Sequence, residues 1–127
     1  MKGENLSLDR MFDLLANQRR RELLVALSKY ATPISLPRLA DEITEAEYGV
    51  PSEQRPKERH RIYMSLYHTH VPKLEDSHVV SYTQSDDSIE WGENASILLT
   101  YLDRLPPSEL PSFESDRQQR TGESTES

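Results

Sequence analysis

Two apolar stripes at helical spacing occur before residue 30. The first stripe comprises Leu8, Phe12 and Leu15, and the second comprises Leu23, Leu24 and Leu27. Ser7 precedes the first stripe and is suited to cap a helix, while Asn17 either breaks that helix or caps a new one in a shifted phase. The pattern therefore predicts a first helical region that is interrupted at Asn17 and ends before a loop at residues 31–33.

A second amphipathic helix is predicted from Ser35 to Tyr48. Its apolar positions are Leu36, Leu39, Ala40 and Ile43. Ser35 is a favourable N-cap, Pro37 is tolerated in the first turn, and Gly49 can end the helix in a left-handed conformation. Ile34, just before this helix, is expected to form a bridge or a short strand.

A third helix, predicted to begin near Pro56, has two contrasting faces on a wheel that turns about 100° per residue. The face directed to the core comprises Ile62, Leu66 and Thr69, with His70 at its edge. The opposite face presents Lys57, His60, Arg61, Met64 and His68, with Tyr67 beside them. Pro72 is expected to kink the helix or to restart it for one turn, because proline lacks a backbone N–H.

Alternating apolar and polar positions after residue 78 predict a β-hairpin, and a further helix follows it. The hairpin strands, 79–84 and 89–91, flank a polar turn, SDDS, and share the apolar set Val80, Tyr82, Ile89 and Trp91. The last helix has Asn94 as its predicted N-cap and Ile97, Leu98, Tyr101 and Leu102 as its apolar face. This order predicts a mostly helical α+β fold, a winged helix-turn-helix with a two-stranded β-hairpin wing and an extra C-terminal helix.

The length of 127 residues favours one domain, which we place at residues 6–105. Residues 106–127 are rich in Pro, Ser, Glu and Gln, and their only large apolar side chains are Leu110 and Phe113. Such a composition does not offset the entropy of ordering, so a disordered polar tail is expected. No apolar run approaches the length of a membrane span, and the first ten residues lack the apolar region of a signal peptide, so a cytoplasmic location is expected.

The formal net charge is -7, but the charges are unevenly distributed. Four of the seven residues at 55–61 are Lys or Arg, whereas acidic residues gather at 41–47 and 86–93. The basic segment is either a surface for a nucleic acid or merely the solvated start of a helix. The arginines at 19–21 are expected to be exposed and paired with Glu22 and its neighbours, with contact to a DNA backbone as the alternative.

An acidic surface with few lysines also suits a salt-rich cytoplasm. At roughly 1 M salt the Debye length is only about 3 Å, so long-range repulsion from a duplex is nearly absent. Counterion release also drives binding far less under these conditions. Short-range contacts would then have to provide more of the binding.

The chain lacks cysteine, which excludes disulfides, thiolate metal sites and a cysteine nucleophile. His68, His70 and His78 raise the question of a metal site, but His68 and His70 are two residues apart on a helix and point about 200° away from each other. His70 is instead expected to be a packed histidine that bonds the wing or the second helix. No Gly-rich phosphate loop occurs and nothing fixes a nucleophile beside a base, so we expect neither an enzyme nor a bound metal or cofactor.

Three segments resemble winged-helix regulators of the ArsR and MarR type. HTHVPKLEDSHVVSY, from His68 to Tyr82, resembles the junction between recognition helix and wing, and NQRRRELLVAL and ISLPRLADEI resemble the first and second helices. Together with the acidic body, these segments make the chain similar to an uncharacterised winged-helix domain family common in salt-loving archaea. The resemblance covers about residues 6–104.

The resemblance implies a DNA-binding transcriptional regulator that inserts its third helix into the major groove, usually as a homodimer. Carried over by position, the side chains that would read bases are Lys57, His60, Arg61, Met64, Tyr67 and His68. Ser35 and Arg38 would hold a phosphate at the start of the second helix. The expected dimer interface comprises Phe12, Ile97, Leu98, Tyr101 and Leu102, although the last helix could instead pack on its own domain. No particular small-molecule effector is indicated.

Two features depart from the pattern of those regulators. The wing tip is acidic where DNA-contacting wings usually carry Arg or Lys, so we do not expect it to enter the minor groove. His78 stands where glycine often precedes the first wing strand, and must therefore adopt a turn conformation. The alternative hypothesis is a winged-helix module that binds protein through the last helix and the hairpin of Trp91, without binding DNA.

Overall fold

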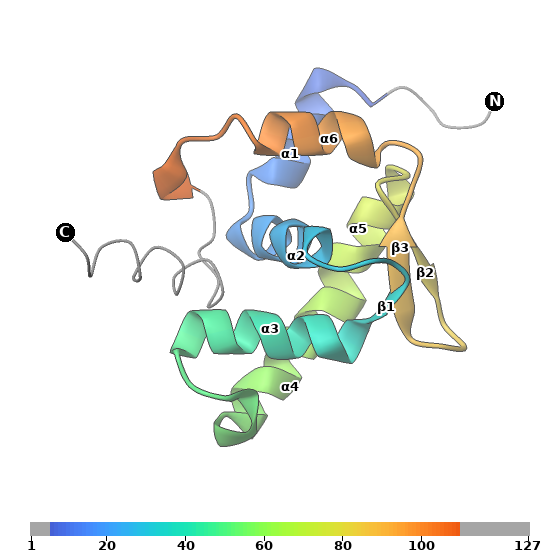
Figure 1. Cartoon of the computed structure of the whole chain (residues 1–127). Helices are drawn as coiled ribbons and strands as arrows, with labels where there is room; N and C mark the ends of the chain where they lie inside the picture. Colours follow the sequence, from blue (N-terminus) through green and yellow to red (C-terminus); the bar gives the residue numbers. More distant parts are fainter. Residues whose placement is uncertain (1–5, 110–127) are drawn as a thin grey trace.

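The structure, a computed structural model, describes residues 6–109 (Figure 1). The helices are α1 (Leu8–Leu15), α2 (Gln18–Ser28), α3 (Leu36–Tyr48), α4 (Pro56–Ser65), α5 (Val71–Asp76) and α6 (Ala95–Leu102). The strands are β1 (Ile34–Ser35), β2 (Val80–Thr83) and β3 (Ser88–Trp91), and the short helical turns are η1 (Ser52–Gln54), η2 (Leu66–His70) and η3 (Pro107–Glu109). The order of helices, hairpin and C-terminal helix is that of a winged helix, so the predicted mostly helical α+β fold is confirmed.

The predicted boundary between domain and tail falls close to the end of the described residues. η3 is a single 3₁₀ turn within the predicted tail, and Arg21 donates to the backbone carbonyl of Glu109 at 2.9 Å. The rest of the predicted tail, from residue 110 onward, lies outside the described residues. Among the described helices, none is both long and apolar enough to cross a membrane.

The three strands form one antiparallel sheet in the order β1-β3-β2. β2 and β3 are the predicted hairpin, with Val80 opposite Trp91. β1 is the predicted short strand and pairs with β3 through Ile34 and Ile89. Because Ser35 ends β1 and also caps α3, the wing is joined directly to the start of the helix-turn-helix.

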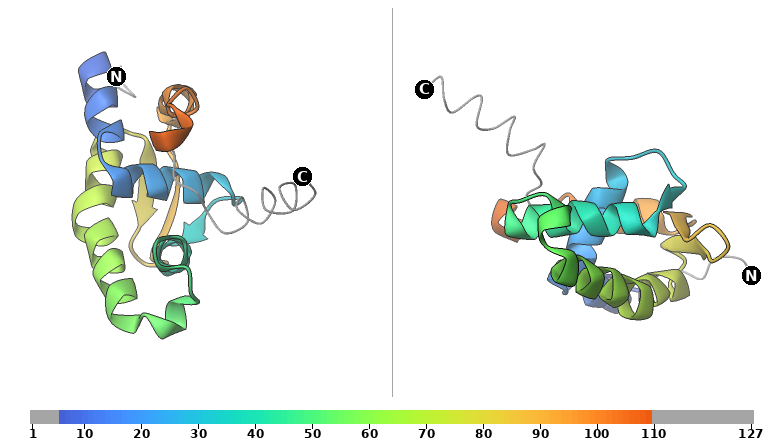
Figure 2. Two further views of the ribbon diagram at one scale, coloured as in Figure 1. Left: turned by 90° about the vertical axis from the view of Figure 1, so that its left-hand side faces the viewer. Right: turned by 90° about the horizontal axis from the view of Figure 1, so that it is seen from below.

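Leucine side chains dominate the core, which α2 crosses in the middle of the molecule (Figure 2). The largest fully buried side chains are Leu14, Leu23, Leu24, Leu27, Leu36, Leu39, Ile43, Leu66, Leu74, Ile89 and Leu98. They come from every helix except α4 and from the central strand β3. Each such side chain contributes roughly 1.5–3 kcal/mol when it is removed from water.

The first two helices begin at the predicted caps. Ser7 and Asn17 each accept a hydrogen bond from the backbone N–H three residues later, at 3.0 and 3.1 Å, so Asn17 starts a new helix. The predicted stripe of α1 is wrong in part, because Leu8 and Phe12 are exposed. The buried residues of α1 are Met11, Leu14 and Leu15. Met11, Leu14 and Leu15 also form an apolar stripe at helical spacing. The position of the packing partners decides which of the two stripes is buried.

The arginine triplet is more buried than predicted. Arg20 is only 6% exposed and donates to the carbonyl oxygens of Asp13 and Leu14 at 2.8 and 2.9 Å, which satisfies the C-terminal end of α1. Its Nη1 lies 3.3 Å from Nδ1 of His70. A guanidinium group can only donate, so Nδ1 accepts and the imidazole proton resides on Nε2. Burial, reinforced by the positive charge of Arg20, lowers the pKa of His70 to about 4, which keeps the ring neutral.

His70 reaches the core because a π turn, η2, continues α4. The N–H of Val71 donates to the carbonyl of Leu66, five residues earlier. The extra residue in this turn rotates the later part of the helix, so His70 is buried and Thr69, predicted to face the core, is exposed. Pro72 has no N–H to donate and comes directly after this turn, so the predicted interruption takes the form of a π turn and the helix resumes as α5.

The turn from α5 into the wing is held by the segment that follows β3. His78 has a φ of 61°, the turn conformation predicted for it. A Cβ at Gly92 would lie 2.4 Å from the His78 carbonyl oxygen, so glycine is required there. Asn94 donates from its backbone to His78 and from its side chain to the carbonyl of Ser77, at 2.8 and 3.0 Å. Asn94 therefore closes this turn, and the prediction that its side chain caps α6 is wrong.

The outer edge of the sheet, β2, is partly covered by α5. The backbone N–H of Tyr82 donates to Oε2 of Glu75 at 3.2 Å. The Glu75 carboxylate therefore takes the place of the backbone carbonyl that a further strand would offer to the Tyr82 N–H.

α6 closes the core at the end of the molecule opposite α4 (Figure 1). Leu98 and Leu102 are 0% and 3% exposed, so the prediction that they contact a second subunit is wrong. Both pack within their own domain. Phe12 and Ile97 are exposed and Tyr101 is half-buried, so these three remain accessible.

A His70→Ala variant should lose about 2–4 kcal/mol of unfolding free energy, because a buried arginine N–H loses its acceptor and a cavity forms. Urea unfolding followed by circular dichroism measures the loss. His68→Ala is the matched control, since His68 lies in the same turn but is exposed, and it should change stability by less than about 0.5 kcal/mol. Equal effects of the two substitutions would contradict the role of the His70–Arg20 contact.

Candidate nucleic-acid interface

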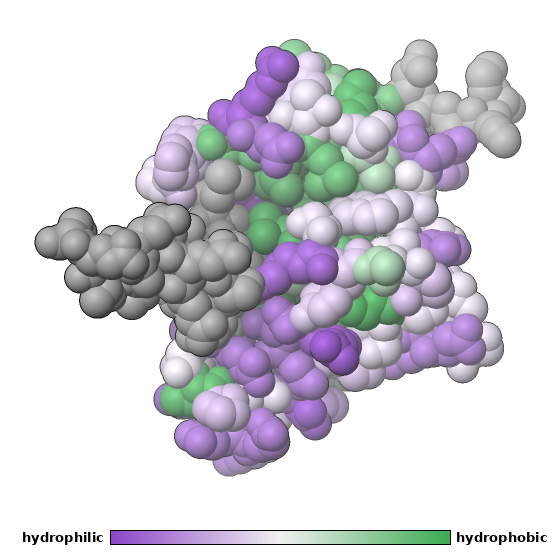
Figure 3. All heavy atoms as spheres, in the orientation of Figure 1, coloured by the Kyte–Doolittle hydropathy of each residue, from purple (hydrophilic) through white to green (hydrophobic). Residues whose placement is uncertain are grey.

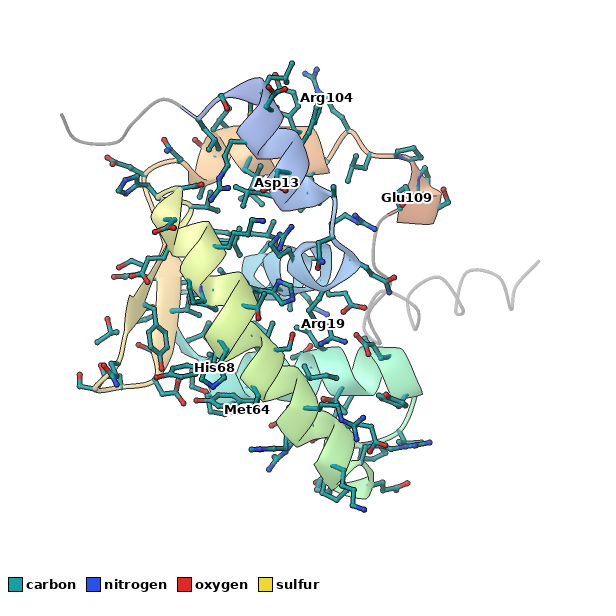
Figure 4. All side chains as sticks on the ribbon, turned by 180° about the vertical axis from the view of Figure 1, so that it is seen from behind. Asp13, Arg19, Met64, His68, Arg104 and Glu109 are labelled. Atoms are coloured by element: carbon teal, nitrogen blue, oxygen red, sulfur yellow. The ribbon has the colours of Figure 1, made fainter. Side chains whose placement is uncertain are left out.

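One helical run, α4 with η2, carries all the side chains predicted to read bases. Lys57, His60, Arg61 and His68 are exposed, whereas Met64 and Tyr67 are partly buried. Figure 4 shows Met64 and His68 on the same side of this helical run. Tyr67 is partly covered because its ring packs against Tyr82 of the wing, with centroids 5.8 Å apart.

Lys57 and Arg61 are cations that no carboxylate neutralises within residues 6–109, since neither forms an ion pair there. Arg59, on the same helix, instead pairs with Asp41 of α3 at 3.1 Å. Lys57 also lies in the first turn of α4, near the positive end of the helix dipole. The N-terminal half of α4 therefore presents positive charge to solvent.

The two predicted phosphate contacts, Ser35 and Arg38, are engaged within the protein. Ser35 Oγ accepts the backbone N–H of Arg38 at 3.2 Å and so caps α3, as predicted. The guanidinium of Arg38 lies over the ring of Tyr30, 5.2 Å from its centroid, in a cation–π contact. Both residues remain exposed at the start of α3.

A hollow of about 220 Å³ lies between α3 and α4. Its lining residues are Pro37, Ala40, Arg59, His60 and Tyr63. The α3 side is apolar, and the α4 side supplies two rings and one guanidinium group.

Asp87 ties the wing to α4. Its carboxylate oxygens accept hydrogen bonds from the hydroxyl groups of Tyr63 and Tyr82, at 2.7 and 2.5 Å. Burial, followed by the hydrogen bond to Asp87 and its charge, raises the pKa of Tyr63 to about 12 and also raises the pKa of Tyr82. Both phenols therefore stay protonated donors at neutral pH. The Asp87 carbonyl also accepts the N–H of Leu36 at 2.8 Å, which adds the start of α3 to the same junction.

Arg19 joins α2, α3 and α4 on the inner side of the helix-turn-helix (Figure 4). Its guanidinium contacts Glu22 at 3.2 Å, Glu47 at 3.1 Å and the hydroxyl of Ser65 at 3.4 Å. Glu22 is 4% exposed. Burial, and then the hydrogen bond to Glu47 and its charge, raises the pKa of Glu22 to about 8. Glu22 therefore holds a proton at neutral pH.

Asp87 and Glu47 were not predicted from the sequence as residues that position the helices, and Glu22 was predicted only as a surface partner of the arginines. A weak signal existed for Glu22, because it directly precedes the apolar run LLVAL and sits three residues after Arg19. No local signal distinguishes Asp87 from Asp86, since its phenol donors come from α4 and β2. Within residues 6–109, no group of three or more His, Asp or Glu side chains is arranged to hold a metal ion.

A Glu22→Gln variant should gain stability over the wild type as the pH rises. The folded-state pKa of about 8 lies above the ordinary value of 4.5, so folded wild type binds more protons than unfolded chain between these values. Its stability contribution is therefore full below about pH 4.5 and is lost as the pH rises toward about 8. Glutamine stays neutral, so the difference between the two proteins should grow by about 1 kcal/mol or more across that window.

Urea unfolding at a series of pH values between about 5 and 9 measures this difference. Glu53→Gln, at an exposed position of η1, is the control and should show no such trend. A constant difference between Glu22→Gln and wild type at all pH values would refute the raised pKa.

Comparison with known protein families gives one match. Residues 12–90 match the family described as Domain of unknown function (DUF7344). The matched segment runs from α1 to β3 and includes α4 and nearly all of the hairpin. Comparisons with curated proteins and with solved structures give no significant match. The family match covers more than half of the 127 residues, and the chain therefore belongs to the DUF7344 family.

Proposed function

We propose that this protein is a DNA-binding transcriptional regulator that places α4 in the major groove. The observation that carries the proposal is the pair Lys57 and Arg61, exposed cations that have no ion-pair partner within residues 6–109. They lie on a helix at one end of the molecule (Figure 1). A helix of ordinary diameter fits the major groove of B-DNA. The resemblance to ArsR-like and MarR-like regulators, and to a winged-helix family of salt-loving archaea, supports the same function.

The side chains along α4 offer complementary contacts for base edges. Arg61 and Lys57 suit the two acceptors of guanine, and Met64 suits the methyl group of thymine. The remaining polar candidates on this helical run are His60, Tyr67 and His68. Ser35 and Arg38, exposed at the start of α3, are suited to contact the phosphate backbone and so to set the register.

The net charge of -7 constrains where such a protein can work. In dilute salt, at roughly 0.01–0.1 M, the acidic body would repel a duplex over about 10–30 Å. At roughly 1 M salt this repulsion is confined to about 3 Å. Binding would then rest on direct contacts by few cations, and its affinity should fall only weakly as salt rises.

A second copy of this chain is the proposed partner at the α1 and α6 end. Leu8, Phe12 and Ile97 are 50%, 54% and 43% exposed, which is unusual for large apolar side chains. Figures 1 and 2 place α1 and α6 at the same end of the molecule, and Figure 3 shows an apolar area over α6. Pairing of two copies there would cover these side chains and leave α4 free.

A protein-binding module is the second candidate, because the hairpin and α6 contain no Lys or Arg. The sequence has no Lys or Arg between Lys73 and Arg104. Under this hypothesis the partner docks on α6 and the hairpin, and substitution of Lys57 and Arg61 leaves that interaction unchanged. Under the DNA-binding hypothesis the same substitutions abolish function.

Substitution of Arg61 or Lys57 by Ala should lower affinity for a selected duplex about tenfold or more, because each contact to a base contributes discrimination of that order. Fluorescence anisotropy in concentrated potassium chloride, with DNA fragments from upstream of the protein's own gene, measures the loss. Arg104→Ala is the matched control, since Arg104 is exposed at the end remote from α4 (Figure 4). Selective binding that survives when both Lys57 and Arg61 are replaced by Ala would argue against α4 as the helix that contacts bases.

Substitution of Phe12 and Ile97 together by Asp should convert a homodimer into a monomer, because both charges would be buried in the proposed interface. Light scattering after size exclusion gives the mass directly. Thr83→Asp, at an exposed polar position of β2, should leave the mass unchanged. A wild-type protein that is monomeric at high concentration would rule out this interface.

A further inference from the structure

We propose that Asp87 is a positioning residue that holds the wing against α4 as a brace, so that the wing stays out of the minor groove and sequence selection is left to α4. This inference rests on the proposed DNA-binding function. It adds that the wing does not contact bases.

The contacts of Asp87 reach three neighbouring elements at once. One carboxylate oxygen accepts the hydroxyl of Tyr63 on α4, and the other accepts the hydroxyl of Tyr82 on β2. The backbone carbonyl accepts the N–H of Leu36 at the start of α3. Asp87 has a φ of 50°, a left-handed backbone conformation. In this conformation its carboxylate faces Tyr63 and Tyr82, and its carbonyl faces the N–H of Leu36. A wing tip that reads DNA would need its side chains directed away from the protein.

Tyrosine rings fill the space between α4 and the wing. Tyr63 and Tyr67 are stacked, with centroids 6.1 Å apart and an interplanar angle of 7°. Tyr67 meets Tyr82 edge-on, with centroids 5.8 Å apart and an angle of 71°. Tyr82 and Asp87 both belong to the wing, so the wing cannot pivot away from α4 without separating the rings of Tyr67 and Tyr82 and breaking the hydrogen bond from Tyr63 to Asp87.

The charge of the wing opposes contact with phosphates. Residues 74–103 contain no Lys or Arg. Their acidic residues are Glu75, Asp76, Asp86, Asp87, Glu90, Glu93 and Asp103. Asp86, at the tip of the hairpin, is exposed. A minor groove is narrow and lined by phosphates, so entry of this tip would bring like charges together.

The brace acts on recognition through α4. Tyr63 lines the hollow between α3 and α4, beside His60, and it is also one of the two phenols bound by Asp87. Loss of the Asp87 carboxylate would free Tyr63 and let α4 shift relative to α3. A shift of that kind should weaken base contacts more than contacts to the phosphate backbone. Selectivity, rather than general attraction to DNA, is the property expected to change.

The test compares variants at Asp87 in the full chain. Asp87→Gly removes the carboxylate and tolerates the left-handed φ, whereas Asp87→Asn keeps an acceptor. The ratio of affinities for the selected duplex and for a scrambled duplex should fall about tenfold in Asp87→Gly. It should recover in part in Asp87→Asn, which keeps one of the two acceptor oxygens, and the salt dependence of binding should be unchanged in both variants, because the phosphate contacts remain. Tyr63→Phe removes the one hydrogen bond that joins Asp87 to α4, without altering the backbone, and should give a smaller fall, which covers the case that Asp87→Gly does not fold.

The position of the wing is tested on the DNA itself. Asp86→Ser should change affinity by less than about twofold, and hydroxyl-radical cleavage should show no protected minor groove beside the α4 site. Protection there, or a marked gain in affinity from Asp86→Ser, would overturn the inference. Selective binding by wild type with equal selectivity in Asp87→Gly and Tyr63→Phe would also overturn it, while leaving the proposed function intact. A wild-type protein that selects no duplex would instead overturn the proposed function, and the inference with it.

Discussion

The structure depends on one long helical run, α4 through α5, which is fastened in its middle by the contact between His70 and Arg20. The π turn directs His70 inward, and the guanidinium that meets it also closes the end of α1. One end of this run carries the exposed cations, and the other end leads into the wing. Arg20 is buried, and its partners are two backbone carbonyls and the neutral His70. These contacts fix the direction of the helical run from α4 to α5, and therefore the positions of its two ends.

The position of α4 is set largely by polar contacts. Ile62 is the one residue within Pro56–Ser65 that is buried, so apolar burial holds this helix weakly. Arg19 reaches Ser65 from the inner side, and Asp87 reaches Tyr63 from the wing. Hydrogen bonds have narrow geometric tolerance, so two such contacts on different sides constrain rotation of the helix more tightly than a few methyl groups would. An exposed helix can thereby keep a defined orientation.

The elements could be predicted from the sequence because caps, prolines and apolar periodicity act locally. Ser7, Asn17 and Ser35 all cap the helices they were expected to cap. Most predictions that failed concern packing between distant segments, as with the exposed Phe12 and the buried Leu98. The side chain of Asn94 does not cap α6, because it donates to the carbonyl of Ser77 instead. The outward side chains of α4 and the packed position of His70 followed from a helical wheel, but the exposure of Thr69 did not, because a π turn changes the periodicity within the helix. The role of Asp87 depends on two tyrosines from different elements, and no spacing in the sequence predicts that these three residues meet.

The hydrogen bond from the Tyr82 backbone to Glu75 has a consequence for self-association. A free strand edge can template β-sheet growth between molecules, and acidic proteins usually resist such aggregation through mutual repulsion. In concentrated salt that repulsion acts over only about 3 Å. A carboxylate that already occupies an outward N–H of β2 blocks one pairing position at any ionic strength. Pairing of a further strand with β2 would therefore first have to displace Glu75 from the Tyr82 N–H, even where surface charge protects least.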